Sequence, residues 1–397
     1  TDLGDRKHVV CVLDGDGEVV EKETIKSDRV ELKRLSEDYP GSRTIIECGA
    51  QSPWISRCLA GHGMEVVVAN ARKVRAIWEA EYKTDDRDAE MLARIGRVDV
   101  KLLRPIRHGS EEAQKQMLSM KMRDTLVRRR LDVINAVRGT LKSLGYRVGN
   151  PSSARFHKVV LEQVPEEQHP VIAPLVEVLR VLGEKIKDYD RMIGLAAGEH
   201  PGARHLQQIT GVGPLTALYF VLKVEDPRRF ARTRDIGPYL GLSPRRDQSG
   251  DCDKQLRITK AGDAYLRRLL VSAAQYILGP FGKDCALREH GLRLCERGGP
   301  RAKKKAVVAV ARKLAVLMIT LWKSGKDFEP GGAVQHESAS GHAPALPEPD
   351  QDPGRGPGWG LVRSSRPTSP QPTPNHEAPR SDDSGDCDAC AVAVRLR

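Results

Sequence analysis

The stretch HVVCVLDGDGEVVEKETI, residues 8–25, determines how the fold begins. Two runs rich in β-branched residues flank "DGDG", and Asp-Gly pairs between such runs favour the tight turn of a β-hairpin. The acids of the turn do not indicate a calcium loop, because the sixth position of such a loop requires glycine and holds Val19 here. The sequence therefore predicts two antiparallel strands near the start of the chain.

Alternating helices and strands follow this hairpin. Apolar periodicity predicts, in order, a helix over 29–39, a buried strand in RTIIECG (43–49), a helix over 53–61, a strand in MEVVVAN (64–70), and helices over 74–80 and 86–95. With a first strand in TDLGD (1–5), the order is three antiparallel strands followed by α, β, α, β, α. This order predicts an α/β domain of the ribonuclease-H-like, or RuvC-like, kind.

Helical patterns dominate the chain beyond this domain. A long helix is predicted over 111–145, with an apolar stripe formed by Val127, Leu131, Ile134, Leu141 and Leu144. A second helix has a stripe with alternating steps of four and three, formed by Leu175, Leu179, Leu182, Ile186, Tyr189 and Ile193. Such a seam packs against another helix. An antiparallel hairpin within the chain and a dimerising coiled coil both satisfy it.

We expect four regions along the chain. They are a RuvC-like catalytic domain (1–105), a coiled-coil helical region (106–200), a mostly helical C-terminal domain (201–328) and a disordered tail (329–397). Composition separates the tail, because residues 331–397 hold 10 of the 25 prolines together with many Gly, Ser and Asp residues. A segment of this kind buries too little apolar surface to fold.

The charge of the chain indicates a polyanionic partner. The net charge is +12, and because residues 331–397 hold 6 basic and 9 acidic side chains, the preceding residues carry +15. Nucleic acid is the commonest partner of so basic a protein. No apolar run reaches the length of a membrane span. The eight cysteines lack the spacing of a disulfide framework, which predicts a cytoplasmic protein. With DNA as its partner, we expect the protein to be associated with the nucleoid. The single CxxC, Cys387 and Cys390, has no second pair, so we do not expect it to bind zinc.

Four carboxylates stand where elements of the predicted α/β domain meet. Asp2 lies in the first strand, Glu47 ends the fourth strand in IIECGA, and Asp85 and Asp88 begin the covering helix in KTDDRDAEML. Asp85 and Asp88 share one helical face because they are three residues apart. Acids gathered in low dielectric repel each other unless cations lie between them. Two Mg²⁺ ions about 4 Å apart are the usual arrangement for in-line phosphodiester displacement, so we predict that these four residues bind Mg²⁺.

The three acids Glu47, Asp85 and Asp88 also have a purely structural explanation, which is the alternative to metal binding. Acidic residues in the first turn of a helix complement its unpaired N–H groups and its macrodipole, with Thr84 or Asp85 as the N-cap. A glutamate such as Glu47, taken by itself, is more often the end of a surface strand. Three neighbouring acids are not expected to bind metal: Asp5, Asp14 and Asp86.

A second group of candidate residues lies in the C-terminal half. ITGVGPLTA (209–217) has the form of a helix-hairpin-helix turn, in which Gly211 and Gly213 would let backbone N–H groups approach a DNA phosphate. A plain helix–helix connection is the alternative. Downstream, Ser249 in QSG is placed in a loop, where a serine usually only forms a turn. Four basic residues around it are candidates for nucleic-acid contacts: Arg245, Arg246, Lys254 and Arg257.

Seven motifs, in this order, resemble the DEDD transposases of bacterial insertion sequences, specifically the insertion-sequence-110 family of bridge-RNA-guided recombinases. They are TDLGD, IIECGA, KTDDRDAEMLA, ITGVGPLTA, YLGLSPR, QSG and RITKAGDAYLRRLL, between residues 1 and 325. The resemblance implies that Asp2, Glu47, Asp85 and Asp88 form the metal-binding tetrad, and that Ser249 attacks DNA to form a covalent phosphoserine. It also implies a structured guide RNA, and homodimers that assemble into a tetrameric synapse.

The expected function is therefore that of a DNA transposase, or recombinase, which excises and inserts an insertion sequence with Mg²⁺, Ser249 and a guide RNA. One alternative is a RuvC-like hydrolytic nuclease that uses the tetrad and water. Another is a non-catalytic nucleic-acid-binding protein. Because the chain begins at Thr1 without a methionine, we expect either that its start is missing or that a very short first strand holds Asp2 weakly.

Overall fold

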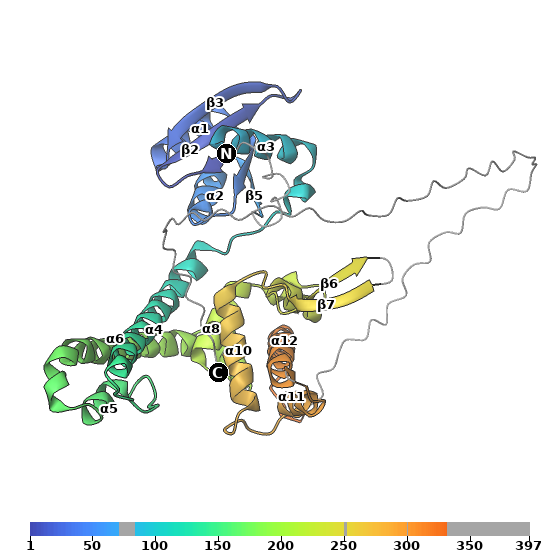
Figure 1. Ribbon diagram of the computed structural model, residues 1–397. Coiled ribbons are helices and arrows are strands. Elements are labelled where there is room, and N and C mark those ends of the chain that lie inside the picture. Colours follow the sequence, from blue (N-terminus) through green and yellow to red (C-terminus); the bar gives the residue numbers. More distant parts are fainter. Residues whose placement is uncertain (71–83, 250–251, 300, 332–397) are drawn as a thin grey trace, which may run out of the picture. The chain divides into compact units, whose positions relative to one another are not determined.

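A computed structural model describes residues 1–70, 84–249, 252–299 and 301–331 (Figure 1). Its N-terminal elements are β1 (Asp2–Leu3), β2 (Lys7–Leu13), β3 (Val19–Lys26), α1 (Arg29–Asp38), β4 (Arg43–Glu47), α2 (Ser52–Gly61), β5 (Glu65–Ala69), α3 (Asp85–Val98) and the 3₁₀ helix η2 (Val100–Leu103). This order confirms the predicted mixed α/β arrangement. The helix predicted over 74–80 lies outside the described residues.

The strands of this N-terminal α/β group form two hydrogen-bonded sheets that meet at β1. Strand β2 pairs antiparallel with both β1 and β3, and β4 pairs parallel with β5. The backbone nitrogen of Thr1 donates to the carbonyl oxygen of Ile45 at 2.8 Å. Strands β1 and β4 are therefore neighbours.

Strands β4 and β5 are buried on both sides, because successive side chains of a strand point to opposite faces. Ile46 packs with Leu59 of α2 in one cluster, to which α1 also contributes. Ile45 and Ala69 pack with Leu92 of α3 in another cluster. Helices α1 and α2 thus cover one face of the sheet, and α3 covers the other.

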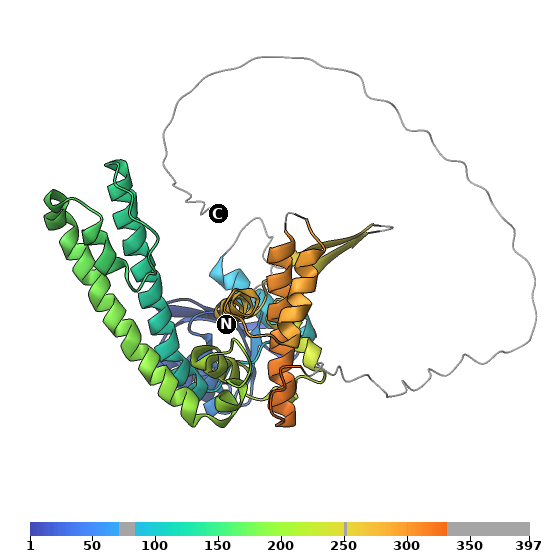
Figure 2. The same cartoon turned by 90° about the horizontal axis from the view of Figure 1, so that it is seen from below.

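The middle of the chain is a helical hairpin made of α4 (Glu111–Ser143), α5 (Phe156–Glu162), the 3₁₀ helix η3 (Glu166–Gln168) and α6 (His169–Glu199). Helices α4 and α6 run side by side (Figure 2). Arg123 in the first half of α4 pairs with Asp190 near the end of α6 at 2.5 Å. Leu141, near the end of α4, packs in one cluster with Ile172, near the start of α6. The antiparallel hairpin, one of the two predicted arrangements, is therefore present.

The predicted apolar stripes of this hairpin were partly wrong. Leu131, Leu144 and Leu175 are exposed. The buried residues of α4 are Ala113, Met117, Met120, Ile134, Val137 and Leu141. Those of α6 are Ile172, Val176, Leu179, Ile186, Ile193 and Ala197. Two apolar stripes lie next to each other on α6, and the position of the partner helix decides which one is buried.

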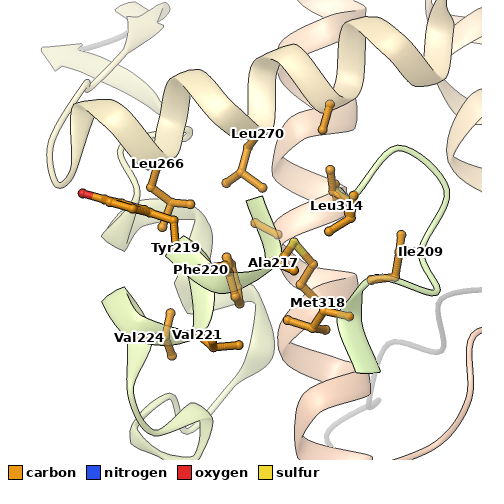
Figure 3. Packing of buried hydrophobic residues seen from close by; sticks show 14 of the residues in the cluster. Ile209, Ala217, Tyr219, Phe220, Val221, Val224, Leu266, Leu270, Leu314 and Met318 are labelled. Atoms are coloured by element: carbon orange, nitrogen blue, oxygen red, sulfur yellow. The ribbon is translucent and has the colours of Figure 1, made fainter. Parts of the chain in front are cut away.

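The C-terminal elements are α7 (Pro201–Leu206), α8 (Pro214–Val224), η4 (Pro227–Arg229), η5 (Thr233–Asp235), α9 (Ile236–Tyr239), β6 (Pro244–Ser249), β7 (Cys252–Ile258), α10 (Ala264–Leu278), α11 (Ala286–Glu296) and α12 (Ala302–Ser324). Helix α8 is the centre of the core. Its residues Ala217 and Phe220 lie in one cluster with Leu270 of α10 and Met318 of α12 (Figure 3). The first half of α4 contributes to the same cluster through Met120.

The helices within the described ranges include none with the length and apolar character needed to span a membrane.

Candidate active site

Asp2 lies in β1 and faces the side of the sheet that α3 covers. It is paired with Val9 of β2, and paired residues share a face. The next residue, Leu3, packs against the core under α1 and α2, so alternation directs Asp2 to the opposite face. Cys11, two residues after Val9, lies on the α3 side too. Burial, followed by the carboxylate of Glu90 in α3, raises the pKa of the Cys11 thiol.

Glu47 is the last residue of β4 and faces the same side. In the parallel register it is paired with Ala69, which ends β5. Ala69 is fully buried against α3, together with Leu92. Because residues paired across two strands share a face, Glu47 lies at the α3 side of the sheet and half-buried.

The turn that follows Glu47 is fixed by a buried serine. The Oγ of Ser52 accepts a hydrogen bond from the backbone N–H of Gly49 at 3.1 Å and lies 2.9 Å from Nε2 of His108. Burial, and then the nearby charge of Arg57, lower the pKa of His108. A neutral imidazole therefore suits this position, and the contact ties the backbone beyond Glu47 to the segment that leads into α4.

Helix α3 begins as the sequence predicts. Thr84 is the N-cap, and its hydroxyl accepts from the backbone N–H of Arg87. Asp85 and Asp86 are exposed in the first turn, whereas Asp88 is only 9% exposed. Asp88 belongs to the buried face of α3, with Leu92 and other residues that pack on the sheet. A carboxylate in that position lies at the edge of the interface between helix and sheet.

A glycine brings α3 close to β4. A Cβ atom added at Gly96 would lie 2.3 Å from Cγ1 of Ile45, well inside van der Waals contact. No side chain separates the helix from the strand at this point. The distance between α3 and β4 is thus set by direct contact of Ile45 with the helix backbone.

The geometry brings together the elements that bear the predicted tetrad. Strands β1 and β4 and helix α3 contact one another. Asp2, Glu47 and Asp88 belong to the interface between them, and each already interacts with a neighbour. Within the described part of the chain, no three His, Cys, Asp or Glu side chains converge as a ready-made metal group. The donor set is nevertheless of the hard oxygen kind that Mg²⁺ prefers.

The glycine turn of ITGVGPLTA connects α7 to α8, as predicted. The backbone N–H of Val212 donates to the carbonyl of Ile209 at 3.0 Å and closes the turn. Gly211 has a φ of +85°, and a Cβ there would lie 2.8 Å from Cγ1 of Ile277 in α10. Gly213 is the N-cap of α8. Contact of this turn with a phosphate stays a prediction.

Ser249 is the last residue of a strand, so the prediction of a loop at this residue was wrong. Strands β6 and β7 form an antiparallel ribbon in which Ser249 is paired with Cys252. The ribbon extends away from the helices of the C-terminal group (Figure 1). Ser249 and the four candidate basic residues are exposed on it. Sequence reasoning missed the ribbon because its strands are polar on both faces and show no apolar alternation.

Close backbone packing anchors the ribbon at its root. Gly241 has a φ of +68°, and a Cβ there would lie 2.2 Å from the carbonyl oxygen of Ala261. Gly262 has a φ of +72°, and a Cβ there would lie 2.1 Å from a carbonyl oxygen of α9. Arg267 of α10 donates to the carbonyl oxygens of Leu240 and Ala261 at 2.8 and 2.7 Å. These residues were not among the predicted site residues, although the glycines in YLGLSPR and RITKAGDAYLRRLL were a signal for them.

Two family models match the chain. Residues 1–145 match the transposase model DEDD_Tnp_IS110, and residues 203–284 match the model described as Transposase IS116/IS110/IS902 family. The chain belongs to the insertion-sequence-110 family of transposases. The first match spans the elements that carry Asp2, Glu47, Asp85 and Asp88 in this transposase, and the second spans the glycine turn and the ribbon.

Curated relatives agree with this assignment. The transposase is 27% identical over 320 residues to the transposase for insertion sequence element IS1111A of Coxiella burnetii, covering 79% of this chain and 85% of the relative. It is 28% identical over 254 residues to the transposase for insertion sequence element IS1328 of Yersinia enterocolitica, covering 62% and 74%. A shorter match, 26% identical over 156 residues, covers 38% of this chain and 47% of the pilin gene-inverting protein of Moraxella bovis.

Proposed function

We propose that this transposase excises and inserts a mobile DNA element with a RuvC-like tetrad and a serine nucleophile. One observation carries the proposal: Asp2, Glu47 and Asp88 lie on the same side of the sheet, at the contact of β1, β4 and α3. The strand order, with β1 between β2 and β4, supports a ribonuclease-H-like fold. The division into regions 1–105, 106–200, 201–328 and 329–397 is part of the same proposal.

Asp2, Glu47, Asp85 and Asp88 would hold Mg²⁺. When bound there, divalent ions neutralise the charge that develops on a phosphodiester and lower the pKa of an attacking hydroxyl. The exposed Asp85 and the buried Asp88 share one face of α3, so the pair reaches from solvent to the sheet. The buried Asp88 would orient the pair, and the half-buried Glu47 would add a ligand from the end of β4.

Ser249 would be the nucleophile. Its Oγ forms a bond to the phosphorus of one DNA phosphodiester and loses its proton to solvent, while one P–O bond of the DNA breaks and the leaving oxygen takes up a proton. The number of phosphoester bonds is conserved, so a DNA hydroxyl reverses the step and rejoins a strand without an external energy source. The position of Ser249 at the end of an exposed ribbon supports access to a duplex.

A structured guide RNA and a second copy of the chain complete the proposed reaction. The charge of +15 outside the tail supports a nucleic-acid partner. Homodimers that assemble into a tetrameric synapse would bring Ser249 of one protomer to the tetrad of another. We expect both from the resemblance to the family.

Covalent trapping tests this function. The full chain is incubated with radiolabelled element-end DNA, Mg²⁺ and RNA transcribed from the flanking element sequence, and then denatured. A labelled protein–DNA adduct that disappears in Ser249→Ala supports the proposal. Cleaved DNA without an adduct would instead support the hydrolytic nuclease, and bound but uncut DNA would support a non-catalytic binding protein.

A second pair of variants tests the tetrad. Glu47→Gln removes a negative ligand and should abolish the adduct. Asp86→Asn is the control. Asp86 lies in the first turn of α3 beside the predicted ligands Asp85 and Asp88, but it is exposed and is not itself a predicted ligand. Equal loss in the two variants would contradict the assignment of the tetrad.

A further inference from the structure

The β6–β7 ribbon has two faces, and its register assigns each residue to one of them. Ser249 is paired with Cys252, and Asp247 is paired with Lys254. Side chains alternate along each strand, so Ser249, Asp247 and Lys254 share a face, called here the serine face. Leu256, two residues after Lys254 and 42% exposed, continues it.

The opposite face holds different residues. Arg246 and Gln248 lie there, and Gln248 is paired with Asp253. The register shifts between Pro244 and Arg246, so Leu256 and Arg257 both lie opposite Arg245 and alternation does not carry Arg257 to this face. The basic residues around Ser249 are therefore not equivalent. Lys254 is on the serine face, as is Arg245, two residues before Asp247, while Arg246 is directed away from it.

Arg246 and Lys254 also differ in ion pairing. The guanidinium of Arg246 is bound to a carboxylate oxygen of Asp253 at 2.7 Å, so it links the two strands. Lys254 forms no ion pair with any carboxylate of the described residues, although Asp247 is directly opposite. Its ammonium group is exposed and free to meet an anion.

The distance along the ribbon fits a contact at the nucleophile. Lys254 is diagonal to Ser249, since Ser249 is opposite Cys252 and Lys254 is two residues further along β7. Diagonal neighbours across an antiparallel pair are about 7–8 Å apart, which is within reach of a long side chain. A phosphate that contacts the Oγ of Ser249 is therefore within reach of the ammonium of Lys254.

We propose that Lys254 binds the DNA phosphate that Ser249 attacks, while Arg246 stiffens the ribbon and does not bind that phosphate. The proposal rests on the proposed role of Ser249 as nucleophile. Lys254 supplies a positive charge next to the phosphorus, on the ribbon that presents the hydroxyl. Leu256 places apolar surface against the sugars on the same side.

Three variants test the proposal: Lys254→Ala, Lys254→Arg and Arg246→Ala, which removes one positive charge from the opposite face. The first readout is the rate of adduct formation on element-end DNA. We expect Lys254→Ala to slow it by about 100- to 1000-fold, as loss of a charge-stabilising contact does at other sites. Lys254→Arg should recover most of the rate, and Arg246→Ala should change it less than Lys254→Ala does.

The second readout is independent of chemistry. Affinity for a duplex is measured at several salt concentrations in the Ser249→Ala background. Loss of one phosphate contact reduces the slope of log affinity against log salt by about 0.9, so we expect that reduction for Lys254→Ala and no change for Lys254→Arg. If Lys254→Ala instead acted by destabilising the ribbon, its affinity for the duplex would fall, and Lys254→Arg would not recover that affinity.

The outcomes separate this inference from the proposed function. If wild-type chain forms the adduct and Lys254→Ala forms it at the same rate, the role of Lys254 is overturned and that of Ser249 stands. If the wild-type chain forms no adduct, the proposed function fails. The phosphate contact of Lys254 is then judged separately: an unchanged slope of log affinity against log salt in Lys254→Ala would overturn it as well. Equal effects of Lys254→Ala and Arg246→Ala on the rate of adduct formation would overturn the assignment of faces.

Discussion

The N-terminal carboxylate face and the C-terminal ribbon present their functional residues in opposite ways. Asp2, Glu47 and Asp88 lie on a framework whose strands are buried on both sides. Ser249 lies at the end of a ribbon that is exposed and is anchored at its root. A group of charges that must keep a fixed spacing gains from a rigid framework, whereas a nucleophile that must reach DNA gains from exposure.

The root of the ribbon is where we expect the largest effect on stability. Gly262→Ala would place a Cβ 2.1 Å from a carbonyl oxygen of α9 at a φ of +72°, so the backbone has to move. We expect a loss of about 2–4 kcal/mol of unfolding free energy, from backbone strain and overlap together. Urea denaturation measures it.

The control for that variant lies in the N-terminal region. Gly63 also has a positive φ, +88°, but a Cβ there meets nothing within 4 Å. Gly63→Ala should therefore cost only about 1 kcal/mol, from the left-handed backbone alone. If the two variants are equally stable, the ribbon root is looser than the close carbonyl contacts indicate.

The next largest effect on the free energy of unfolding is expected at the contact between α3 and β4. Gly96→Ala places a Cβ 2.3 Å from Cγ1 of Ile45 and forces the helix away from the strand. Overpacking of this kind costs about 1–3 kcal/mol, and it shifts Asp88 relative to Glu47, so adduct formation should fall as well. Thermal or urea unfolding and the trapping assay check the two effects.

An open glycine in the helical hairpin provides the comparison. Gly139 of α4 has no atom within 4 Å of an added Cβ, so Gly139→Ala should stabilise the chain by up to about 1 kcal/mol through helix propensity. Destabilisation by Gly139→Ala, or no effect of Gly96→Ala, would contradict the packing described for these helices.

The smallest expected effect concerns an ion pair that holds α3 to the first hairpin. Glu90 accepts hydrogen bonds from Lys22 and Arg94, both at 2.8 Å. Its pKa is lowered from 4.5 by these two bonds, so its contribution to stability is present above pH 4.5 and is lost as the pH falls through the lower pKa of the folded state.

Glu90→Gln should therefore lower stability at pH 7 by about 0.5–1 kcal/mol, and the difference from wild type should vanish in acid. Glu37→Gln is the control, because the pair of Glu37 with Lys33 is far more exposed. Urea denaturation at a series of pH values measures both variants. A difference that persists in acid would show that Glu90 acts through packing.

The sequence was sufficient to predict the strands and α-helices of the described N-terminal part, since strong apolar periodicity and Asp-Gly pairs mark them. The cap at Thr84 and the burial pattern of β4 followed from local rules. The ribbon was not predictable in this way, because PRRDQS has no apolar face and its pairing depends on the anchors at Gly241 and Gly262.

The α4–α6 seam shows a second limit of sequence reasoning. Both Leu175 and Val176 lie on stripes with coiled-coil spacing, but only Val176 is buried. Local sequence cannot decide between adjacent stripes, because the choice depends on where the partner helix lies. For the same reason, the faces of the ribbon became known only from its register.

The alternation of β4 has a consequence for the evolution of this protein. Ile45 and Ile46 face opposite helices, and Glu47 takes its direction from the same alternation. Gain or loss of one codon inside the strand would turn the glutamate toward α2, whereas a change of two codons would return it to α3. Related genes that keep an active enzyme should therefore tolerate length changes inside this strand only in steps that preserve its parity.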